Sequence, residues 1–308
     1  MFDTLTMAPI SERAAVLALV SATRGDWYRT AVLIEDAGSA LRVIRRDWTG
    51  FEPFDVSQAE ALVEGVSPDD LRRYEGIIAS HEEQGVRVVT VLDDDYPVNL
   101  RQVYNRPPFL FIRGELRERD NRAVAIVGTR NPSQAGLDQA RRLSQGLARS
   151  DVAVLSGLAR GIDSAAHRGA LDAGGRTVAV MGTGIDRIYP SEHRDLADEI
   201  LRSGALVSQF WPQGPPTKVS FPMRNVVMSG MAIGTVVIEA SSTSGARMQA
   251  RLALEHGKRL FLVKSLVMHE DWANRYAERP GTMVVDSVEE ILDVLVTMAR
   301  PAEQLTLS

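Results

Sequence analysis

The sequence contains no cysteine among its 308 residues, which excludes disulfide bonds, thiolate metal ligands and cysteine nucleophiles. Its five histidines are scattered along the chain and are not grouped at metal-ligand spacings. We therefore expect no metal and no cofactor. Because disulfides are rare in the cytoplasm, the missing cysteines are compatible with a cytoplasmic protein, which is the location we expect.

Long apolar runs are also missing. No stretch approaches the roughly 18 apolar residues of a membrane-spanning helix. The N-terminus has an early acidic residue and no basic segment, unlike a signal peptide, and we expect no membrane contact. The chain has no excess of positive charge either, since its formal net charge is −5. A chain this acidic can bind nucleic acid only if its lysines and arginines gather in one patch.

The region 1–84 carries the pattern of a small helical domain. Apolar residues recur with the period of an α-helix in four segments, and serines stand where N-caps are expected. These segments are 11–22, 27–38, 57–66 and 67–85. Because no lysine-rich or glycine-rich hairpin occurs in them, we expect this domain to have a structural or partner-docking role.

Beyond Gly85 the pattern changes to short apolar runs rich in valine and isoleucine, most of them separated by helix-length segments. The runs are 86–92, 109–114, 123–128, 152–157, 177–182, 205–210, 235–240 and 259–264. This alternation predicts an α/β domain over 85–300, with a doubly wound, mostly parallel sheet and helices on both faces. An amphipathic helix at 287–299 closes the domain, and we expect residues 301–308 to form a frayed tail.

The first chemical motif is Gly128-Thr129-Arg130, which follows a predicted strand and precedes a predicted helix. Backbone N–H groups at such a turn, together with the helix N-terminus, favour an anion. Arg130 adds a two-pronged donor for phosphate. The plainer alternative is a strand–helix turn with a surface arginine. The spacing is not that of the G-x-G-x-x-G dinucleotide fingerprint.

The second motif, SGLARGID at 156–163, is another glycine-containing turn between a strand and a helix. We expect Ser156, Gly157, Arg160 and Gly161 to contact nucleic acid, since glycine permits close approach of the backbone to a ligand.

Two polar residues of the same region, Asp163 and His167, are predicted to organise this loop. Asp163 can cap the helix that follows it, and His167 can orient the loop by hydrogen bonding. A hydrolase triad of Ser156, His167 and Asp163 is an alternative. We disfavour it because the G-x-S-x-G nucleophile turn is missing, and we expect no catalytic residue.

Two further loops follow predicted strands. One contains Gly182 and Gly184, and the other begins at Glu239 and reaches Ser244-Gly245 at the start of a helix. Backbone donors at these turns can bind phosphate, although Ser244 is also an ordinary helix N-cap. Because ligands of such sheets bind beyond the carboxyl ends of the strands, we expect all of these loops to line one crevice. We assign Glu239 a role in organising its loop.

The segment around Phe221 combines cations with an aromatic ring. Lys218 and Arg224 flank Phe221, and Asn225 follows. Cations that hold phosphates beside a ring that stacks on a base are typical of single-strand binding. The alternative is that Phe221 belongs to the core and that the two cations are solvated.

In this order and spacing, the motifs resemble the DprA/Smf family of DNA-processing proteins. The resemblance spans roughly residues 94–264, and SGLARGID is its most specific element. It is carried by Tyr96-Pro97, Gly128-Thr129-Arg130, SGLARGID, Ala166-His167, Gly182-Thr183-Gly184, Tyr189-Pro190, Phe221-Pro222 with Arg224-Asn225, and Glu239 with Ser244-Gly245.

The resemblance implies an extended Rossmann fold, a homodimer, binding of single-stranded DNA and cooperation with the RecA recombinase. By position it implies that Arg130 and Lys218 contact the DNA backbone. It also implies that Phe221, Arg224 and Asn225 contribute to the same pocket. We therefore expect a non-enzymatic DNA-processing protein that acts in recombination or in a defence system.

Several positions depart from the family pattern. Val226 stands where members commonly have arginine, Gln209 where glutamate is usual, and the segment after 259–263 reads KSLVMHEDWANRYAERPG where Pro-Gly is usual. We also expect this member to lack the family's C-terminal winged-helix-like domain. These departures place RecA loading and natural transformation in question for this chain.

Two other functions remain open from the residues. The same crevice suits a nucleotide sensor or a phosphoribohydrolase-like enzyme, but EASSTSGAR at 239–247 lacks the double glycine and trailing glutamate of such enzymes. A protein-interaction module with a vestigial pocket is the third interpretation, which the negative net charge favours.

Overall fold

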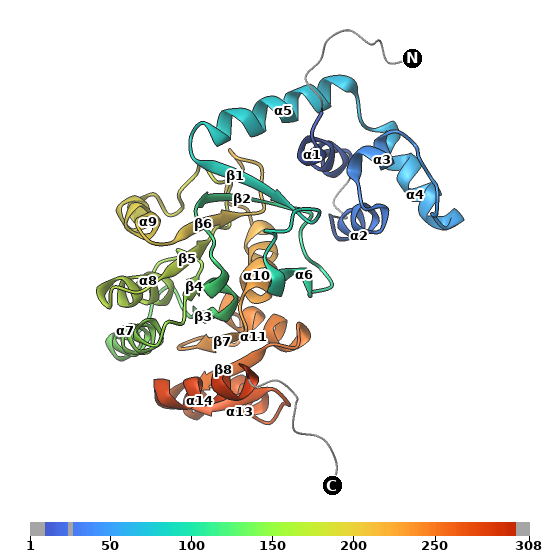
Figure 1. Ribbon diagram of the computed structural model, residues 1–308. Coiled ribbons are helices and arrows are strands. Elements are labelled where there is room, and N and C mark those ends of the chain that lie inside the picture. Colours follow the sequence, from blue (N-terminus) through green and yellow to red (C-terminus); the bar gives the residue numbers. More distant parts are fainter. Residues whose placement is uncertain (1–9, 24–26, 300–308) are drawn as a thin grey trace.

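The computed structural model describes residues 10–23 and 27–299. A group of helices lies at one end of the molecule (Figure 1). These are α1 (Glu12–Ala22), α2 (Trp27–Ala37), α3 (Ala40–Ile44), α4 (Pro53–Glu64) and α5 (Pro68–Glu82). Serine caps begin three of them: the Ser11 side chain accepts from the N–H of Ala14, Ser39 accepts from that of Arg42, and Ser67 forms a capping box with Asp70.

Helix α1 forms the centre of this group. Its residues 14–20, AAVLALV, are all buried, because α2, α3, α4 and α5 pack around it. A helix that is apolar on every side is stable only inside a core. The composition of α1 therefore accounts for the arrangement of the other helices around it.

Within the described residues, nine strands form one sheet in the order β1-β2-β6-β5-β4-β3-β7-β8-β9. The strands are β1 (Val86–Thr90), β2 (Phe109–Gly114), β3 (Val124–Val127), β4 (Val154–Ser156), β5 (Thr177–Val180), β6 (Ala205–Ser208), β7 (Gly234–Val237), β8 (Arg259–Val263) and β9 (Thr282–Val285). Neighbours from β6 to β9 are parallel, whereas β2 runs antiparallel to both β1 and β6.

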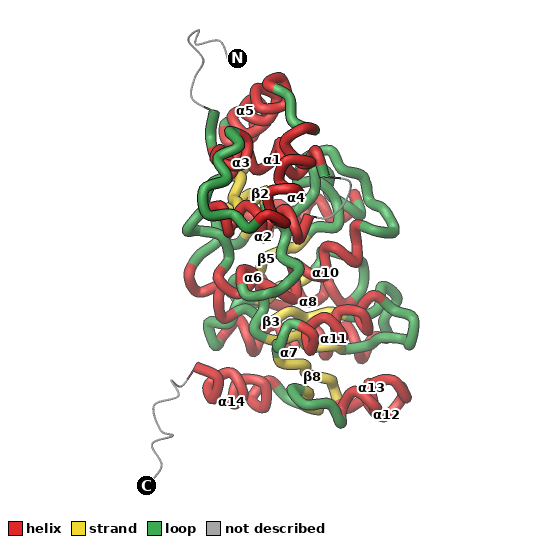
Figure 2. Tube along the Cα trace, turned by 90° about the vertical axis from the view of Figure 1, so that its right-hand side faces the viewer, coloured by secondary structure: helices red, strands yellow, loops and turns green. Residues whose placement is uncertain are grey.

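Helices cover both faces of this sheet (Figure 1). On one face lie α7 (Gln134–Arg149), α8 (Ile162–Asp172) and α9 (Arg194–Leu201); on the other lie α6 (Val98–Arg101), α10 (Ser220–Met231) and α11 (Gly245–Glu255). Near β9, at the end of the molecule away from α1–α5, lie α12 (Lys264–His269), α13 (Asp271–Ala277) and α14 (Val288–Ala299) (Figure 2). Short 3₁₀ turns, η1 (Glu118–Arg122) and η2 (Ser191–His193), precede β3 and α9.

The direction of winding changes at β3. From β3 the chain moves outward through β4 and β5 to β6, and it then returns to place β7 on the other side of β3. A crevice forms outside the carboxyl ends of the strands at such a reversal, because the adjacent loops leave in opposite directions. The turns after β3, β4 and β7 therefore surround one hollow.

The predicted fold class is confirmed, and each of the eight predicted strand segments overlaps a strand. The sequence pattern does not predict β9, because Met283 and Val284 are partly exposed at the sheet edge and its run is short. The helical segment ends at Glu82 and the sheet begins at Val86. The predicted tail 301–308 lies outside the described residues. Among the described residues, no helix is both long and apolar enough to cross a bilayer.

Candidate nucleic-acid interface

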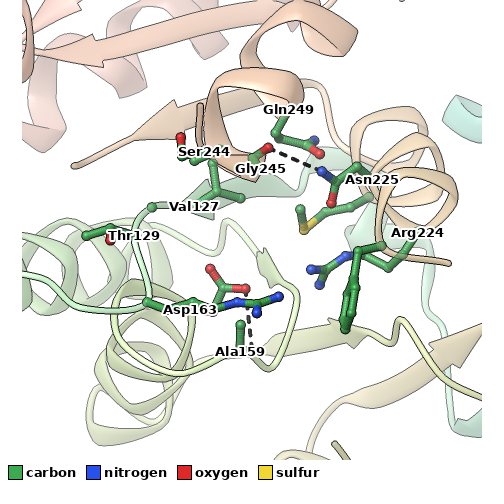
Figure 3. A pocket seen from close by; sticks show the side chains of 14 residues that line it. Val127, Thr129, Ala159, Asp163, Arg224, Asn225, Ser244, Gly245 and Gln249 are labelled. Carbon is green, nitrogen blue, oxygen red and sulfur yellow. Dashed lines mark hydrogen bonds between the residues drawn. The ribbon is translucent and has the colours of Figure 1, made fainter. Parts of the chain in front are cut away.

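A pocket of about 420 Å³ opens at the carboxyl ends of the strands, where the winding reverses. The turn after β3 and the start of α8 form one side of it, and α10 and α11 form the other (Figure 3). Its lining consists of Val127, Gly128, Thr129, Arg130, Ala159, Asp163, Phe221, Arg224, Asn225, Met228, Ser244, Gly245, Ala246 and Gln249. The pocket therefore brings together side chains from four segments that are far apart in the sequence.

The turn after β3 is held in place by Glu239. The Glu239 carboxylate accepts hydrogen bonds from the backbone N–H of Ser133, at 2.9 Å, and from the Ser133 hydroxyl. The backbone N–H of Thr129 donates to the Glu239 carbonyl at 2.6 Å. Gly128 is needed here because a Cβ at this position would lie 2.4 Å from Cγ1 of Ile162. These contacts fix the turn that presents Thr129 and Arg130.

Asp163 organises the turn after β4. Its Oδ2 accepts from the backbone N–H groups of Gly157, at 3.1 Å, and Ala159, at 3.4 Å. Gly161 has φ +77°, and a Cβ there would lie 2.5 Å from the Thr129 carbonyl oxygen, so the turns after β3 and β4 pack directly together. The backbone at this side of the pocket is consequently well fixed before any ligand arrives.

Arg224 supplies a buried cation to the pocket. The residue is 6% exposed, and its Nη1 donates to the Val180 carbonyl at 3.0 Å. Its Nε is buried and has no hydrogen-bond partner among the described residues. Burial raises the pKa of Asp163 and lowers the pKa of the Arg224 guanidinium, and each charge opposes the shift of the other. Both side chains point into the pocket (Figure 3).

Arg130 and Lys218 supply exposed cations. The Arg130 guanidinium lies over the Phe221 ring, 5.0 Å from its centroid, which is the geometry of a cation–π contact. Lys218 is exposed two residues before α10 and does not line the pocket itself. Within the described part of the chain, neither Arg130 nor Lys218 forms an ion pair. Both charges are therefore available to an anionic ligand.

The N-terminus of α11 closes the other side of the pocket. Ser244 is its N-cap and accepts from the backbone N–H of Arg247 at 3.2 Å. Asn225 of α10 donates from Nδ2 to the Gly245 carbonyl at 3.3 Å, which ties the two helices together. The helix dipole and the first-turn N–H groups of α11 add positive potential to the pocket. Two guanidinium groups and this helix end thus face a single carboxylate, Asp163, which is already hydrogen-bonded.

A smaller slot of about 30 Å³ continues from the pocket past Phe221. It is lined by Arg130, Gly157, Ala159, Arg160, Gly182, Thr183, Tyr189, Pro190 and Phe221. Arg160 pairs here with both oxygens of Glu192, at 2.5 and 2.7 Å, so its charge is largely neutralised. Gly182 lets Phe221 approach, because a Cβ there would lie 2.7 Å from the ring.

Several predicted residues line neither the pocket nor the slot, among them Lys218, Gly161, Ser156, His167 and Gly184. Ser156 is fully buried, and its hydroxyl donates to the Ile126 carbonyl at 2.7 Å. His167 is also fully buried and bonds through Nδ1 to the Thr177 hydroxyl at 2.7 Å, so it ties α8 to β5 and does not orient the loop. With these partners, Ser156, His167 and Asp163 do not form a triad. Gly184 packs beneath Trp211, whose carbonyl oxygen would be 2.0 Å from a Cβ at Gly184.

The buried His167 leads to a prediction on stability. Burial lowers the pKa of His167 from 6.5 to about 3, with smaller contributions from the charges of His193 and Arg224. The unfolded chain therefore takes up a proton near pH 6.5 that the folded chain takes up only near pH 3. We expect the free energy of unfolding to fall by about 1.4 kcal/mol per pH unit within this window because of His167.

Urea unfolding of the wild type and of His167→Gln between pH 7 and pH 4 measures this contribution. Two other groups also take up protons as the pH falls. The raised pKa of Asp163 increases the free energy of unfolding at low pH, whereas the pKa of His256, lowered to about 4, decreases it as that of His167 does. Because Asp163 and His256 remain in the variant, the difference between the wild type and His167→Gln in the slope of unfolding free energy against pH measures the contribution of His167. Equal slopes would show that His167 is not held neutral by the fold.

The segment 211–217, which leads to Lys218, is docked on the turn after β5. The backbone N–H of Gly184 donates to the Gly214 carbonyl at 2.9 Å, and that of Asp186 donates to the Pro212 carbonyl at 3.0 Å. The Trp211 ring stacks on Tyr74 of α5, with 5.2 Å between centroids. The N-terminal helices therefore contact the segment that positions Lys218.

Sequence reasoning did not identify Tyr189 and Gln249 as site residues. Tyr189 lines the slot, and Gln249 of α11 lines the pocket beside Asn225 (Figure 3). The motif Tyr189-Pro190 is visible in the sequence, but its proximity to Phe221 is set by long-range packing. Gln249 belongs to no motif, and a glutamine within an amphipathic helix is expected to lie on the surface.

The fold and the pocket together define a class: a doubly wound α/β protein with an anion-attracting crevice at the point where its winding reverses. Comparison with known proteins names the family. Residues 87–295 match the family described as DNA recombination-mediator protein A, and the chain belongs to this family. The predicted resemblance to DprA/Smf proteins is thereby confirmed.

Individual relatives extend this likeness over most of the chain. The DNA processing protein DprA of Bacillus subtilis is 33% identical over 226 residues, which are 71% of this chain and 74% of the relative. The crystal structure of DprA from Streptococcus pneumoniae superposes with a TM-score of 0.73 at 29% identity, covering 92% of this chain and 98% of that one. DprA from Helicobacter pylori, described by its single-stranded DNA binding mode, shares the fold, with a TM-score of 0.61 at 24% identity over 69% and 96% of the two chains.

Proposed function

We propose that this chain binds single-stranded DNA in the pocket at the winding reversal and acts as a recombination mediator without catalysing a reaction. The observation that carries the proposal is the convergence of Arg130 and Arg224 beside the Phe221 ring, between two backbone turns that already have fixed conformations. A single strand offers both phosphates and unpaired bases, which is the combination that cations next to an aromatic ring recognise. Membership in the recombination-mediator family supports the same ligand.

The position of Glu239 argues against a nucleotide-cleaving enzyme. Its carboxylate is engaged by Ser133 and lies on the far side of the Thr129 turn, in a separate pocket of about 470 Å³. A carboxylate held in this way cannot reach a ligand between Arg130 and Arg224 to serve as nucleophile or base. Chromatography after incubation with nucleoside monophosphates tests this point: we expect no free base.

We further propose a cytoplasmic homodimer that cooperates with RecA. The exposed edge of the sheet supports the dimer, because β9 leaves one row of backbone groups unpaired and exposes Met283 and Val284. The family description as a recombination mediator supports RecA as the partner. Sedimentation velocity of the chain, alone and mixed with RecA on DNA, tests both parts.

Substitution of the exposed cations tests DNA binding directly. We expect Arg130→Ala and Lys218→Ala each to weaken binding of oligo-dT about tenfold, because each removes a charged hydrogen bond to a phosphate. The slope of log affinity against log salt should also become shallower by about 0.7 for each lost phosphate contact. Fluorescence anisotropy at several salt concentrations measures both quantities.

Arg149→Ala is the matched control. Arg149 is exposed at the C-terminal end of α7, whereas the pocket lies beside the N-terminal end of that helix. We expect this variant to retain the affinity and the salt slope of the wild type. Binding that does not respond to salt, or that all three variants weaken equally, would contradict a specific role for Arg130 and Lys218.

A further inference from the structure

Tyr189 presents an aromatic ring to solvent next to the pocket. The residue is 44% exposed, while its neighbour Pro190 is buried and Ile188 packs against the core. The backbone around Tyr189 is therefore anchored on both sides, and its ring stands outward. The centroids of the Tyr189 and Phe221 rings are 6.1 Å apart, with 47° between the ring planes.

Phe221 itself is largely covered in the absence of a ligand. The Arg130 guanidinium lies over its ring, and Gly182 contacts its Cδ1–Cε1 side. The slot between Phe221 and Tyr189 has about 30 Å³, which is room for a water molecule and not for a nucleobase. A base that meets an open aromatic surface at this edge of the pocket therefore meets the outward face of Tyr189.

We propose that Tyr189 is a second stacking platform, which holds the base of a nucleotide adjacent to the one whose phosphate lies between Arg130 and Arg224. This inference rests on the proposed binding of single-stranded DNA and adds a contact to bases, beyond the contacts to phosphates. A base has a π-face whatever its identity, so Tyr189 contributes affinity without sequence preference. Of the two arginines that line the slot, Arg160 is paired with Glu192, and Arg130 lies over the Phe221 ring on the side of the phosphate pocket.

The test compares two ligands of equal length and charge, oligo-dT and an abasic deoxyribose-phosphate oligomer. We expect Tyr189→Ala to weaken binding of oligo-dT about tenfold, within the range of one base–aromatic stack, and to leave binding of the abasic oligomer unchanged. Tyr189→Phe, which keeps the ring and loses the hydroxyl, should bind oligo-dT like the wild type. Arg130→Ala should weaken both ligands, because it removes a contact to phosphate.

Each outcome decides a different point. Equal binding of oligo-dT by Tyr189→Ala and the wild type overturns the stacking role and leaves the proposed function intact. An equal loss on both oligomers also overturns it, because the variant then disturbs the phosphate site. A wild type that binds neither oligomer overturns the proposed function and this inference together. Tyr189→Trp adds a positive readout, since stacking predicts quenching of the new fluorophore on addition of oligo-dT.

Discussion

Replacing Gly157 with alanine should lower the affinity for single-stranded DNA by about 10- to 100-fold, the range expected when a charged hydrogen bond is lost. A Cβ on Gly157 would lie 1.4 Å from Nη1 and 2.2 Å from Cζ of Arg224. The guanidinium would have to leave its place and its bond to the Val180 carbonyl. The change thus displaces the Arg224 guanidinium from the pocket although no lysine or arginine is replaced.

Anisotropy with oligo-dT measures the affinity, and circular dichroism checks that the variant is folded. Gly76→Ala in α5 is the matched control, because a Cβ there meets nothing within 4 Å. We expect this control to bind DNA like the wild type and to gain about 0.5–1 kcal/mol of stability, as alanine replaces glycine inside a helix. Wild-type affinity in Gly157→Ala would show that Arg224 does not hold a phosphate.

The contrast between Gly157 and Ser156 shows what the sequence can predict about this site. The order of strands, glycine-containing turns and helices predicts that the turns after β3 and β4 lie at one sheet edge, because that follows from parallel winding. It does not predict which side chains face the pocket. Ser156, the last residue of β4, turns its hydroxyl toward β3, whereas Gly157 follows directly and lies beneath a side chain from α10.

The sequence also does not show which charged side chains are paired with residues far away along the chain. Arg160 stands in the most specific motif, but Glu192, 32 residues later, takes up its charge. Lys218 gains its position from Trp211, whose ring lies against Tyr74 of the N-terminal helices and Phe109 of β2. These partners are joined by tertiary packing that no local pattern encodes, so only the structure separates the available cations from the paired ones.

The helical domain contacts the surroundings of the segment before Lys218 through Asp186 as well as through Trp211. The Asp186 carboxylate accepts from Gln213 at 2.9 Å and from Arg113 of β2 at 3.3 Å, and it lies 3.2 Å from His81 of α5. The segment before Lys218 is thereby held by both the sheet and the N-terminal helices. The helical domain thus contacts the segment that leads to Lys218, although it lines neither the pocket nor the slot.

The largest expected effect on stability concerns Asp163. Asp163→Ala removes the acceptor of two backbone N–H groups and leaves the buried charge of Arg224 without its facing carboxylate. We expect a loss of about 3–5 kcal/mol in the free energy of unfolding, as measured when one partner of a buried charge pair is removed. Asp163→Asn should lose less, because the amide oxygen can still accept from Gly157 and Ala159.

Removing the charges of both Asp163 and Arg224 distinguishes their effect on the stability of the fold from their effect on DNA binding. The double variant Asp163→Asn with Arg224→Met keeps the hydrogen bonds from Gly157 and Ala159, loses the bond to the Val180 carbonyl and removes both buried charges from the pocket, so we expect its stability to lie within about 1–2 kcal/mol of the wild type. Its affinity for oligo-dT should nevertheless fall as far as that of Gly157→Ala, because neither variant has the Arg224 guanidinium in its place in the pocket. Urea unfolding of the double variant measures its stability, and fluorescence anisotropy with oligo-dT measures its affinity.

Two results would contradict this interpretation of Asp163 and Arg224. A double variant as unstable as Asp163→Ala would mean that the two charges do not compensate each other. A double variant that binds DNA like the wild type would mean that the phosphate lies elsewhere. The expected combination, a stable fold with an affinity for oligo-dT lowered about 10- to 100-fold, follows from the burial of both groups: the two charges compensate each other within the fold, and Arg224 is the buried cation that a phosphate in the pocket would meet.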